Sequence, residues 1–319
     1  MKLLKSSAFW RRIAIVILLA IIFIRPTFST NTAKRETTNL NIWFLVDATN
    51  SMVVKDVDGG NTRRFEKVQS DIESIVKSVP GAKYGLIVED FTTYSAAPLS
   101  TDSNSIVAAK SYVIPKSSFY SQPTALSELL GYAKKNIKAN LVLHPERNNV
   151  VVFMSDGEDF SGSDYTVQNG ISDYIKSAII FGYGSAEGGP INQVNSAYNI
   201  EEKGIINEDQ CEQYYYRYED YGLTKDSNGC VLSKIDEGSL KKLATTLSGD
   251  YYHRESGDVP ADVTEKLKSY ATVATDDDSE ASAKKQLYWI FAIILLGLLL
   301  WEGEELIVRI LLEKEKKHD

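Results

Sequence analysis

The sequence predicts an α/β fold, in which a doubly wound, mostly parallel sheet is flanked by helices and a transmembrane helix lies at each end of the chain. Short apolar runs alternate with stretches whose apolar residues recur every three or four positions, as in amphipathic helices. The runs are apolar throughout, which is typical of strands buried on both faces of a parallel sheet. Two further apolar runs, 13–24 and 287–301, lie outside this alternation.

The predicted elements follow one another in a regular order. The short apolar runs predict strands at 41–46, 84–88, 150–154 and 178–183, with shorter strands at 93–97 and 250–252. Helical spacing occurs over 65–79, 102–111, 126–137, 168–177 and 240–247, and Pro260 begins a last helix. Two stretches rich in polar and small residues, 30–39 and 271–285, are interpreted as linkers. The folded domain is therefore expected over 40–270.

The two outlying apolar runs predict membrane segments. Residues 1–29 are interpreted as a basic N-terminus with a signal anchor or, alternatively, a cleaved signal peptide. Residues 286–302 are expected to form a transmembrane helix and 303–319 a tail. Basic residues flank the runs at Lys2, Lys5, Arg11 and Arg12, and at Arg309, Lys314, Lys316 and Lys317. Because basic flanks remain in the cytoplasm, both termini are expected there and the folded domain outside.

Charge and cysteine content narrow the partners and the compartment. The net charge of −8 argues against nucleic acid as a partner, because phosphate binding requires a basic surface. The two cysteines, Cys211 and Cys230, both lie in the predicted outer domain. An even pair in an oxidising compartment indicates a disulfide, with two free thiols as the alternative.

Oxygen-bearing side chains gather where two predicted strands end. Asp47 directly follows the strand at 41–46, and Asp156 follows the strand at 150–154. In doubly wound sheets, ligands bind beyond the carboxyl ends of the strands. Two carboxylates converging there repel each other unless a cation lies between them. Between Asp47 and Ser51, alternate positions supply a carboxylate and two hydroxyls.

A metal site follows from these donors. Thr124 precedes the helix at 126–137 and offers a further hydroxyl, so the predicted metal ligands are Asp47, Thr49, Ser51, Thr124 and Asp156. Hard oxygen donors without thiolate or imidazole favour Mg²⁺, or Mn²⁺ or Ca²⁺ in its place. Neutral hydroxyls leave part of the ion's charge uncompensated. The ion is therefore expected to accept an acidic ligand from a protein partner.

These residues resemble a known motif. The segment Asp47-Ala48-Thr49-Asn50-Ser51 is similar to the D-x-[ST]-x-S loop of the metal-ion-dependent adhesion site in von Willebrand factor A (VWA) domains. Thr124 and the Ser-Asp-Gly at 155–157 resemble the remaining ligand segments of that site. The resemblance covers 41–184 and implies a VWA, Rossmann-like fold with a protein-binding role. Thr49 replaces a commoner serine, and Gln122-Pro123 replaces the usual glycines.

A narrower resemblance is to the Bat-like, aerotolerance-operon membrane proteins of bacteria. It is carried by Ser51-Met52 with Asp56, by the glycine-rich stretch at 182–191, and by 225–236. The resemblance implies a domain exposed outside the bacterial plasma membrane. It also implies other VWA membrane proteins and a MoxR-type AAA+ ATPase as partners. The Cys- and Tyr-rich insertion at about 192–232 is longer than the family pattern, and its tyrosines are interpreted either as a contact surface or as packing under the cysteine loop.

Three classes of function remain to be compared. The leading hypothesis is a non-enzymatic module for metal-dependent protein–protein interaction or complex assembly. The alternative is a structural membrane scaffold whose metal only stabilises the fold. A metal-dependent hydrolase is disfavoured, because no general base is recognisable in the sequence.

Overall fold

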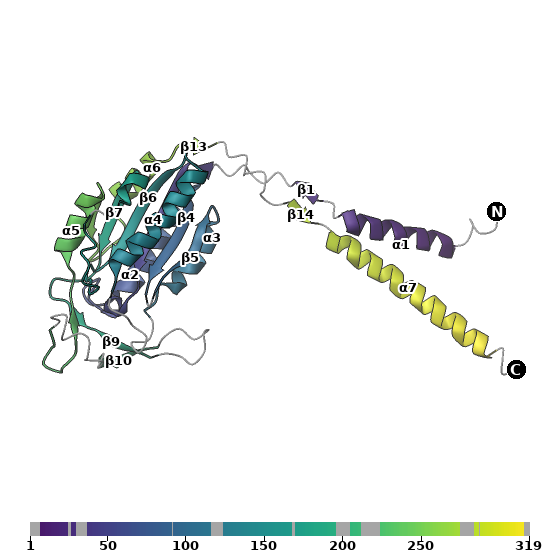
Figure 1. Cartoon of the computed structure of the whole chain (residues 1–319). Coiled ribbons are helices and arrows are strands. Elements are labelled where there is room, and N and C mark those ends of the chain that lie inside the picture. Colours follow the sequence, from purple (N-terminus) through teal and green to yellow (C-terminus); the bar gives the residue numbers. More distant parts are fainter. Residues whose placement is uncertain are drawn as a thin grey trace. The chain divides into compact units, whose positions relative to one another are not determined.

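The computed structural model describes residues 7–24, 27–29, 37–90, 92–115, 124–167, 170–195, 205–211, 224–274, 284–286 and 288–315. Two compact units make up the chain (Figure 1). Unit 1 consists of 1–35 and 276–319, and unit 2 consists of 36–275. The predicted folded domain at 40–270 therefore lies within unit 2.

Unit 2 is built on a six-stranded sheet with the strand order β12-β7-β6-β3-β4-β5. The strands are β3 (Leu40–Asp47), β4 (Lys83–Glu89), β5 (Thr93–Ser100), β6 (Asn148–Ser155), β7 (Ser177–Gly182) and β12 (Asp250–His253). Neighbouring strands are parallel except at the edge, where β5 runs antiparallel to β4. The predicted mostly parallel sheet is thus found as a mixed sheet with one antiparallel edge strand.

Helices cover both faces of this sheet (Figure 1). They are α2 (Arg64–Ser78), α3 (Ser103–Ala109), α4 (Leu126–Leu143), α5 (Glu237–Thr246) and α6 (Ala261–Ser269). Alternate residues of β3 point to opposite faces, so Phe44 packs in the core with α2 and α6, whereas Leu45 packs in the core with α4 and α5. Central strands that bury both faces explain why their sequences are apolar throughout.

One predicted helix is wrong. The sequence pattern predicts a helix over 168–177, but the described part of that range contains only the short 3₁₀ turn η4 (Ser172–Tyr174), after which β7 begins. Gly170 has a φ of +71°, in the left-handed region, which a regular right-handed helix does not contain. In the part of the crossover from β6 to β7 that the structure describes, η4 is therefore the single helical turn.

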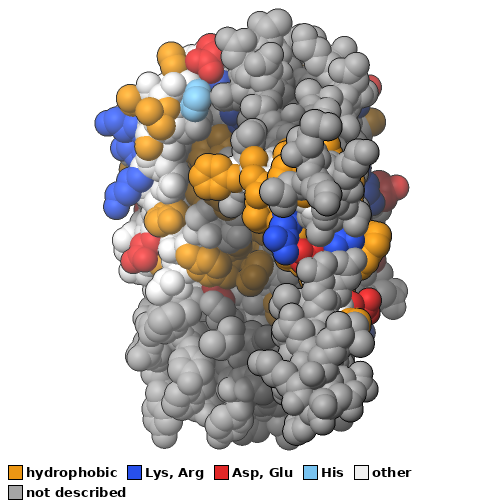
Figure 2. All heavy atoms as spheres, turned by 90° about the vertical axis from the view of Figure 1, so that its right-hand side faces the viewer, with side chains coloured by type: hydrophobic (Ala, Val, Ile, Leu, Met, Phe, Trp, Pro, Cys, Tyr) orange, Lys and Arg blue, Asp and Glu red, His pale blue; other side chains and the backbone are white. Residues whose placement is uncertain are grey.

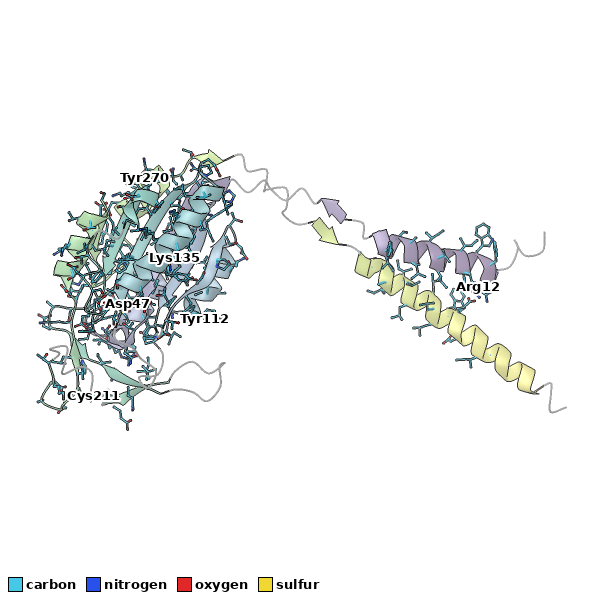
Figure 3. All side chains as sticks on the ribbon, in the orientation of Figure 1. Arg12, Asp47, Tyr112, Lys135, Cys211 and Tyr270 are labelled. Carbon is cyan, nitrogen blue, oxygen red and sulfur yellow. A yellow bond between two sulfur atoms is a disulfide. The ribbon has the colours of Figure 1, made fainter. Side chains whose placement is uncertain are left out.

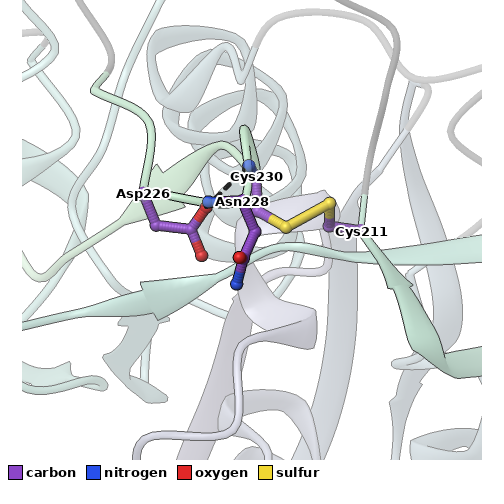
Figure 4. The surroundings of a disulfide bond; sticks show 4 residues. All are labelled: Cys211, Asp226, Asn228 and Cys230. Atoms are coloured by element: carbon purple, nitrogen blue, oxygen red, sulfur yellow. Dashed lines mark hydrogen bonds between the residues drawn. A yellow bond between two sulfur atoms is a disulfide. The ribbon is translucent and has the colours of Figure 1, made fainter.

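Two pairs of short strands between residues 189 and 233 lie at the carboxyl end of the sheet and are called the arm (Figure 1). β9 (Asn192–Asn195) pairs with β10 (Ile205–Cys211), and β8 (Gly189–Pro190) pairs with β11 (Leu232–Ser233), both antiparallel. The predicted disulfide between Cys211 and Cys230 is confirmed, with the two Cα atoms 5.4 Å apart. Asp226 shapes the turn before Cys230 by accepting the backbone N–H groups of Asn228 and Cys230 (Figure 4). The tyrosines interpreted either as a contact surface or as packing under the cysteine loop lie within 212–223, outside the described residues.

Unit 1 pairs the two ends of the chain. The strands β1 (Thr27–Ser29) and β14 (Lys284–Gln286) run antiparallel, and they adjoin the helices α1 (Ser7–Ile24) and α7 (Tyr288–Glu315). Arg11 and Arg12 of α1 both donate to Glu302 of α7, at 3.3 and 3.0 Å. The Arg11 guanidinium also lies 5.0 Å from the ring centroid of Trp301. These contacts join the first third of α1 to the middle of α7.

The transmembrane helices predicted within 1–29 and at 286–302 are a wrong prediction. Among the helices in the described part of the chain, none is long and apolar enough to cross a membrane. α1 has 18 residues and includes Arg11 and Arg12, whereas a bilayer core requires about 20 apolar residues. In α7 the run of apolar residues is interrupted by Glu302 and Glu304, and the helix itself continues to Glu315, through most of the predicted tail. Unit 1 nevertheless exposes apolar side chains, including Ile293 and Leu300. Figure 2 shows hydrophobic and charged side chains close together on one face of the molecule.

Candidate metal centre

The five predicted ligands come from three segments at one end of the sheet. Asp47 is the last residue of β3, and Asp156 follows the last residue of β6. Thr49 and Ser51 lie at the start of the short helix η2 (Asn50–Val53), and Thr124 precedes α4. Asp47 lies at the end of the sheet opposite Tyr270 (Figure 3). Parallel strands place their carboxyl ends side by side, so residues distant in sequence meet here.

Short contacts between polar atoms connect the five side chains. Thr49 Oγ1 donates to Asp47 Oδ1 at 2.7 Å and accepts from Thr124 Oγ1 at 3.1 Å. Thr49 Oγ1 and Ser51 Oγ are 3.4 Å apart, and Ser51 hydrogen-bonds the carboxylate of Asp156. Every one of these residues is buried, with at most 6 % of its surface exposed. The structure therefore brings together the complete predicted set.

The loop after β6 holds both the second aspartate and the threonine segment in place. Gly157 has a φ of +87°, and a Cβ there would lie 2.7 Å from the carbonyl oxygen of Asp236. Only glycine permits this close approach to the start of α5. Asp159 accepts the backbone N–H of Leu126 at 2.8 Å, while the N–H of Phe160 donates to the carbonyl of Thr124 at 3.0 Å. The same loop thus positions Asp156 and the start of α4.

The carboxylates of the site carry more negative charge than this environment favours. Burial raises the pKa of Asp47, and the nearby charge of Asp156 raises it further. Burial also raises the pKa of Asp156, although the Arg64 guanidinium offsets part of that effect. The pKa of Glu158 is raised by burial and then by Asp156. A cation bound between these groups would relieve both the repulsion and the loss of hydration.

Glu89 adds a further buried acid beside the site. It is the last residue of β4, and its backbone carbonyl accepts the N–H of Ala48 at 2.7 Å. Only 3 % of its surface is exposed, and burial raises its pKa to about 7. Thr93 donates a hydrogen bond to its carboxylate. The polar residue that ends this strand is therefore internal and faces the same end of the sheet.

Sequence reasoning missed two residues that contact the predicted ligands and a third that contacts one of these two. Ser155 Oγ donates to Asp47 Oδ2 at 2.7 Å. Arg64 Nη1 donates to Asp156 Oδ2 at 2.8 Å, and Ser233 Oγ accepts from the same nitrogen at 2.7 Å. Ser155 was detectable as the neighbour of Asp156, but nothing in the local sequence separates Arg64 from the adjacent Arg63. Ser233 reaches the site only through the pairing of β11 with β8.

The matching family model identifies the domain. Residues 42–158 match the model described as the von Willebrand factor type A domain. The chain contains a VWA domain. The match includes all five predicted ligands, the whole of β6 and most of β3. Among curated proteins, none matches this sequence.

Two solved bacterial structures are similar in fold to most of this chain, including the VWA domain. One is described as the conserved hypothetical protein BatB from Bacteroides thetaiotaomicron, with a TM-score of 0.50 and 20 % identity over 72 % of this chain and 95 % of that one. The other is described as an aerotolerance-related membrane protein from Bacteroides fragilis, with a TM-score of 0.50 and 19 % identity over 72 % and 96 %. At these identities the similarity concerns the fold. The predicted resemblance to Bat-like VWA proteins is confirmed at that level.

The donors of this VWA domain fit a hard divalent cation. Within the described residues, no group of three or more His, Cys, Asp or Glu side chains could hold a metal. The candidate site instead combines two carboxylates with three hydroxyls, all buried. Such a set suits Mg²⁺, Mn²⁺ or Ca²⁺ and lacks the nitrogen and sulfur ligands that Zn²⁺ favours. Asp47, Thr49, Ser51, Thr124 and Asp156 are the residues that would hold the ion.

Proposed function

We propose that the VWA domain binds a divalent cation, Mg²⁺ in the first place, and uses it to bind an acidic group of a protein partner. The observation that carries this proposal is the single buried cluster formed by the five ligand-type side chains. Two buried carboxylates with raised pKa values favour a cation, and the three hydroxyls leave the ion's charge only partly compensated. When bound, the metal supplies a Lewis-acidic site for the partner's carboxylate.

The disulfide supports a place outside the cytoplasm. Disulfides persist in oxidising compartments, and the bond between Cys211 and Cys230 closes the arm at the same end of the sheet as the candidate site. The Bacteroides fragilis protein is described as a membrane protein. By analogy we propose that this chain acts at the bacterial plasma membrane, with its VWA domain on the outer side. Other VWA membrane proteins and a MoxR-type ATPase are proposed partners on the same analogy.

Calorimetric titration of the full-length chain tests the metal site. Mg²⁺, Mn²⁺ and Ca²⁺ are titrated separately into the wild type, into Asp156→Asn, and into Asp173→Asn as a matched control. Asp173 is an exposed carboxylate on η4, so its replacement removes the same charge away from the site. We expect saturable binding by the wild type and the control, and a loss of at least about 100-fold in Asp156→Asn, because a ligating carboxylate is removed. Equal binding by all three proteins would contradict the proposal.

A second measurement separates a binding module from a scaffold. Proteins that co-purify with the wild type are compared in Mg²⁺, in chelator, and with Asp156→Asn in Mg²⁺. Partners that are lost in both chelator and variant support metal-dependent binding. In the contrary outcome, the metal raises the melting temperature of the wild type while the same proteins co-purify in Mg²⁺, in chelator and with the variant. That result would mean that the metal only stabilises the fold, and it would favour the scaffold alternative.

A further inference from the structure

One cation is already built into the candidate site. Arg64, the first residue of α2, has no exposed surface. Its guanidinium donates two hydrogen bonds to Asp56, at 2.9 and 2.7 Å. It also donates to Asp156 Oδ2 at 2.8 Å and to the Ser51 carbonyl at 3.3 Å. Ser233 accepts two more, at its hydroxyl and its carbonyl oxygen.

This arrangement connects three parts of the site. Asp56 and Ser51 belong to the loop after β3, Asp156 follows β6, and Ser233 lies in β11 beyond the disulfide. Gly184 makes room for the guanidinium, because a Cβ there would lie 2.7 Å from Arg64 Nε. The chain thus provides a space fitted to the arginine as well as acceptors for it. A buried arginine with complete hydrogen bonding holds a fixed position.

The contacts of Arg64 are of two kinds. The pair of hydrogen bonds to Asp56 is bidentate and engages a residue outside the predicted ligand set. The bond to Asp156 engages a predicted metal ligand directly. A cation at the site would attract the same carboxylate that Arg64 holds. The bonds to Asp56 and Ser233 would keep the guanidinium in place when Asp156 turns toward the metal.

We propose that Arg64 is an internal counter-ion of the metal site, which competes with the divalent cation for Asp156 and thereby limits the affinity for metal. This inference rests on the proposed function, since it concerns the same site. Without metal, Arg64 compensates the charge of Asp156 and keeps the site assembled. With metal, the bond between Arg64 and Asp156 weakens. Arg64 therefore determines at which metal concentration the domain becomes competent to bind a partner.

Metal titration of an arginine variant tests the competition. Arg64→Gln removes the charge and retains hydrogen-bonding groups, and Arg254→Gln is the matched control. Arg254, like Arg64, is almost fully buried. It forms a bidentate pair with Asp71, which lies on α2, the helix of Arg64, but outside the predicted ligand set. We expect Arg64→Gln to lower stability in chelator and to bind Mg²⁺ and Mn²⁺ about 10-fold more tightly or better, because a unit charge beside Asp156 is removed. Arg254→Gln should lower stability without changing the affinity for metal.

The wild type provides a test that does not depend on the folding of a variant. The side-chain ¹⁵N–H signals of Arg64 and Arg254 are followed during Mg²⁺ titration of the full-length chain. We expect the Arg64 signals to shift with the same saturation as metal binding and the Arg254 signals to stay unchanged. Unchanged Arg64 signals at saturating Mg²⁺ would overturn the inference, as would an Arg64→Gln variant that folds and binds metal no more tightly than the wild type.

The outcomes distinguish this inference from the proposed function. If the wild type binds no metal but Arg64→Gln does, Arg64 is the cation that occupies the site, and metal-dependent binding by the natural protein is overturned. If neither binds, both proposals are overturned. If the wild type binds metal and Arg64→Gln binds more weakly, the proposed function holds, and Arg64 is a structural support that does not compete with the metal.

Discussion

The two ends of the central strands both bury polar side chains, but they do so in different ways. At the amino end, Asn149 Oδ1 accepts from Asn41 and from the indole of Trp43, both at 2.9 Å. Arg147 donates to Asn41 Oδ1 at 2.6 Å and to the carbonyls of Thr38 and Leu40. At the carboxyl end, Asp47 and Asp156 are buried with raised pKa values and share their surroundings with Arg64.

The difference lies in charge. The amino-end network consists of neutral amides, peptide groups and one arginine, and its hydrogen bonds join the start of β3 to the start of β6. The carboxyl-end cluster buries carboxylates close to one another. Burial raises the pKa of each, and the charge of Asp156 raises the pKa of Asp47 and Glu158 further. A hydrogen-bonded network of mainly neutral groups serves the fold, whereas an excess of buried carboxylates over buried cations favours a bound cation. This comparison yields four predictions.

The largest expected effect is on stability, at the amino end. Arg147→Met should lower the free energy of unfolding by about 3–4 kcal/mol, because Asn41 Oδ1 and two backbone carbonyls lose a buried donor. Urea unfolding measures the change. Lys135→Met, at an exposed position on α4, is the control and should change stability by less than about 0.5 kcal/mol. Affinity for Mg²⁺ should be unaffected; a change would mean that the two ends are coupled.

The disulfide should contribute almost as much. Its two cysteines are 19 residues apart, so replacing both with serine should lower stability by about 3 kcal/mol, chiefly by releasing a constraint on the unfolded chain. Thermal unfolding of the variant, compared with the wild type in the presence and absence of reductant, measures this. The reduced wild type should match the variant. A variant as stable as the oxidised wild type would show that the arm folds independently of its bond.

Removing one carboxylate should stabilise the metal-free site. Burial and the charge of Asp156 raise the pKa of Asp47. At pH 8 the Asp47 carboxylate is ionised in both states, and the ionised form has a higher free energy in the folded chain than in the unfolded chain. Asp47→Asn should therefore raise the free energy of unfolding in chelator by about 1–2 kcal/mol at pH 8. It should also abolish the additional stability that Mg²⁺ gives the wild type. A variant that is destabilised in chelator would indicate that Asp47 serves the fold, like the amino-end network.

The smallest effect concerns the pH dependence from Glu89. Its pKa is about 7 in the folded chain and lies at its ordinary value near 4.5 when unfolded. Between these values the unfolded state binds fewer protons, so the stability that protonated Glu89 provides is lost as pH rises from about 4.5 to 7. Glu89→Gln should flatten this dependence by on the order of 1 kcal/mol in chelator. Urea midpoints of the two proteins at pH 5 and pH 8 measure it, and parallel curves would contradict the assignment.

The sequence determined the sheet, most of its helices and the five members of the candidate site. Strands buried on both faces must be apolar throughout, and helices that cover them must repeat their apolar residues every three or four positions. Both periodicities are local, so they can be read without contacts. Asp47 and Asp156 were recognisable because polar residues directly after buried strands meet at one edge of a parallel sheet. The cysteine pair was recognisable because two cysteines allow only one intramolecular bond.

The tertiary structure alone decided which charges meet. Apolar content suggested that both chain ends cross a membrane, but helix length and the positions of Arg11, Arg12 and Glu302 in the folded helices do not support that. Arg64 precedes Asp156 by 92 residues and Ser233 follows Arg64 by 169, so neither contact has a local signal. Electrostatic interaction depends on distance through space and on burial, and both are set only when the sheet and its loops have assembled. The sequence therefore predicts the candidate set of metal ligands, whereas the contact of Arg64 with this set is visible only in the folded structure.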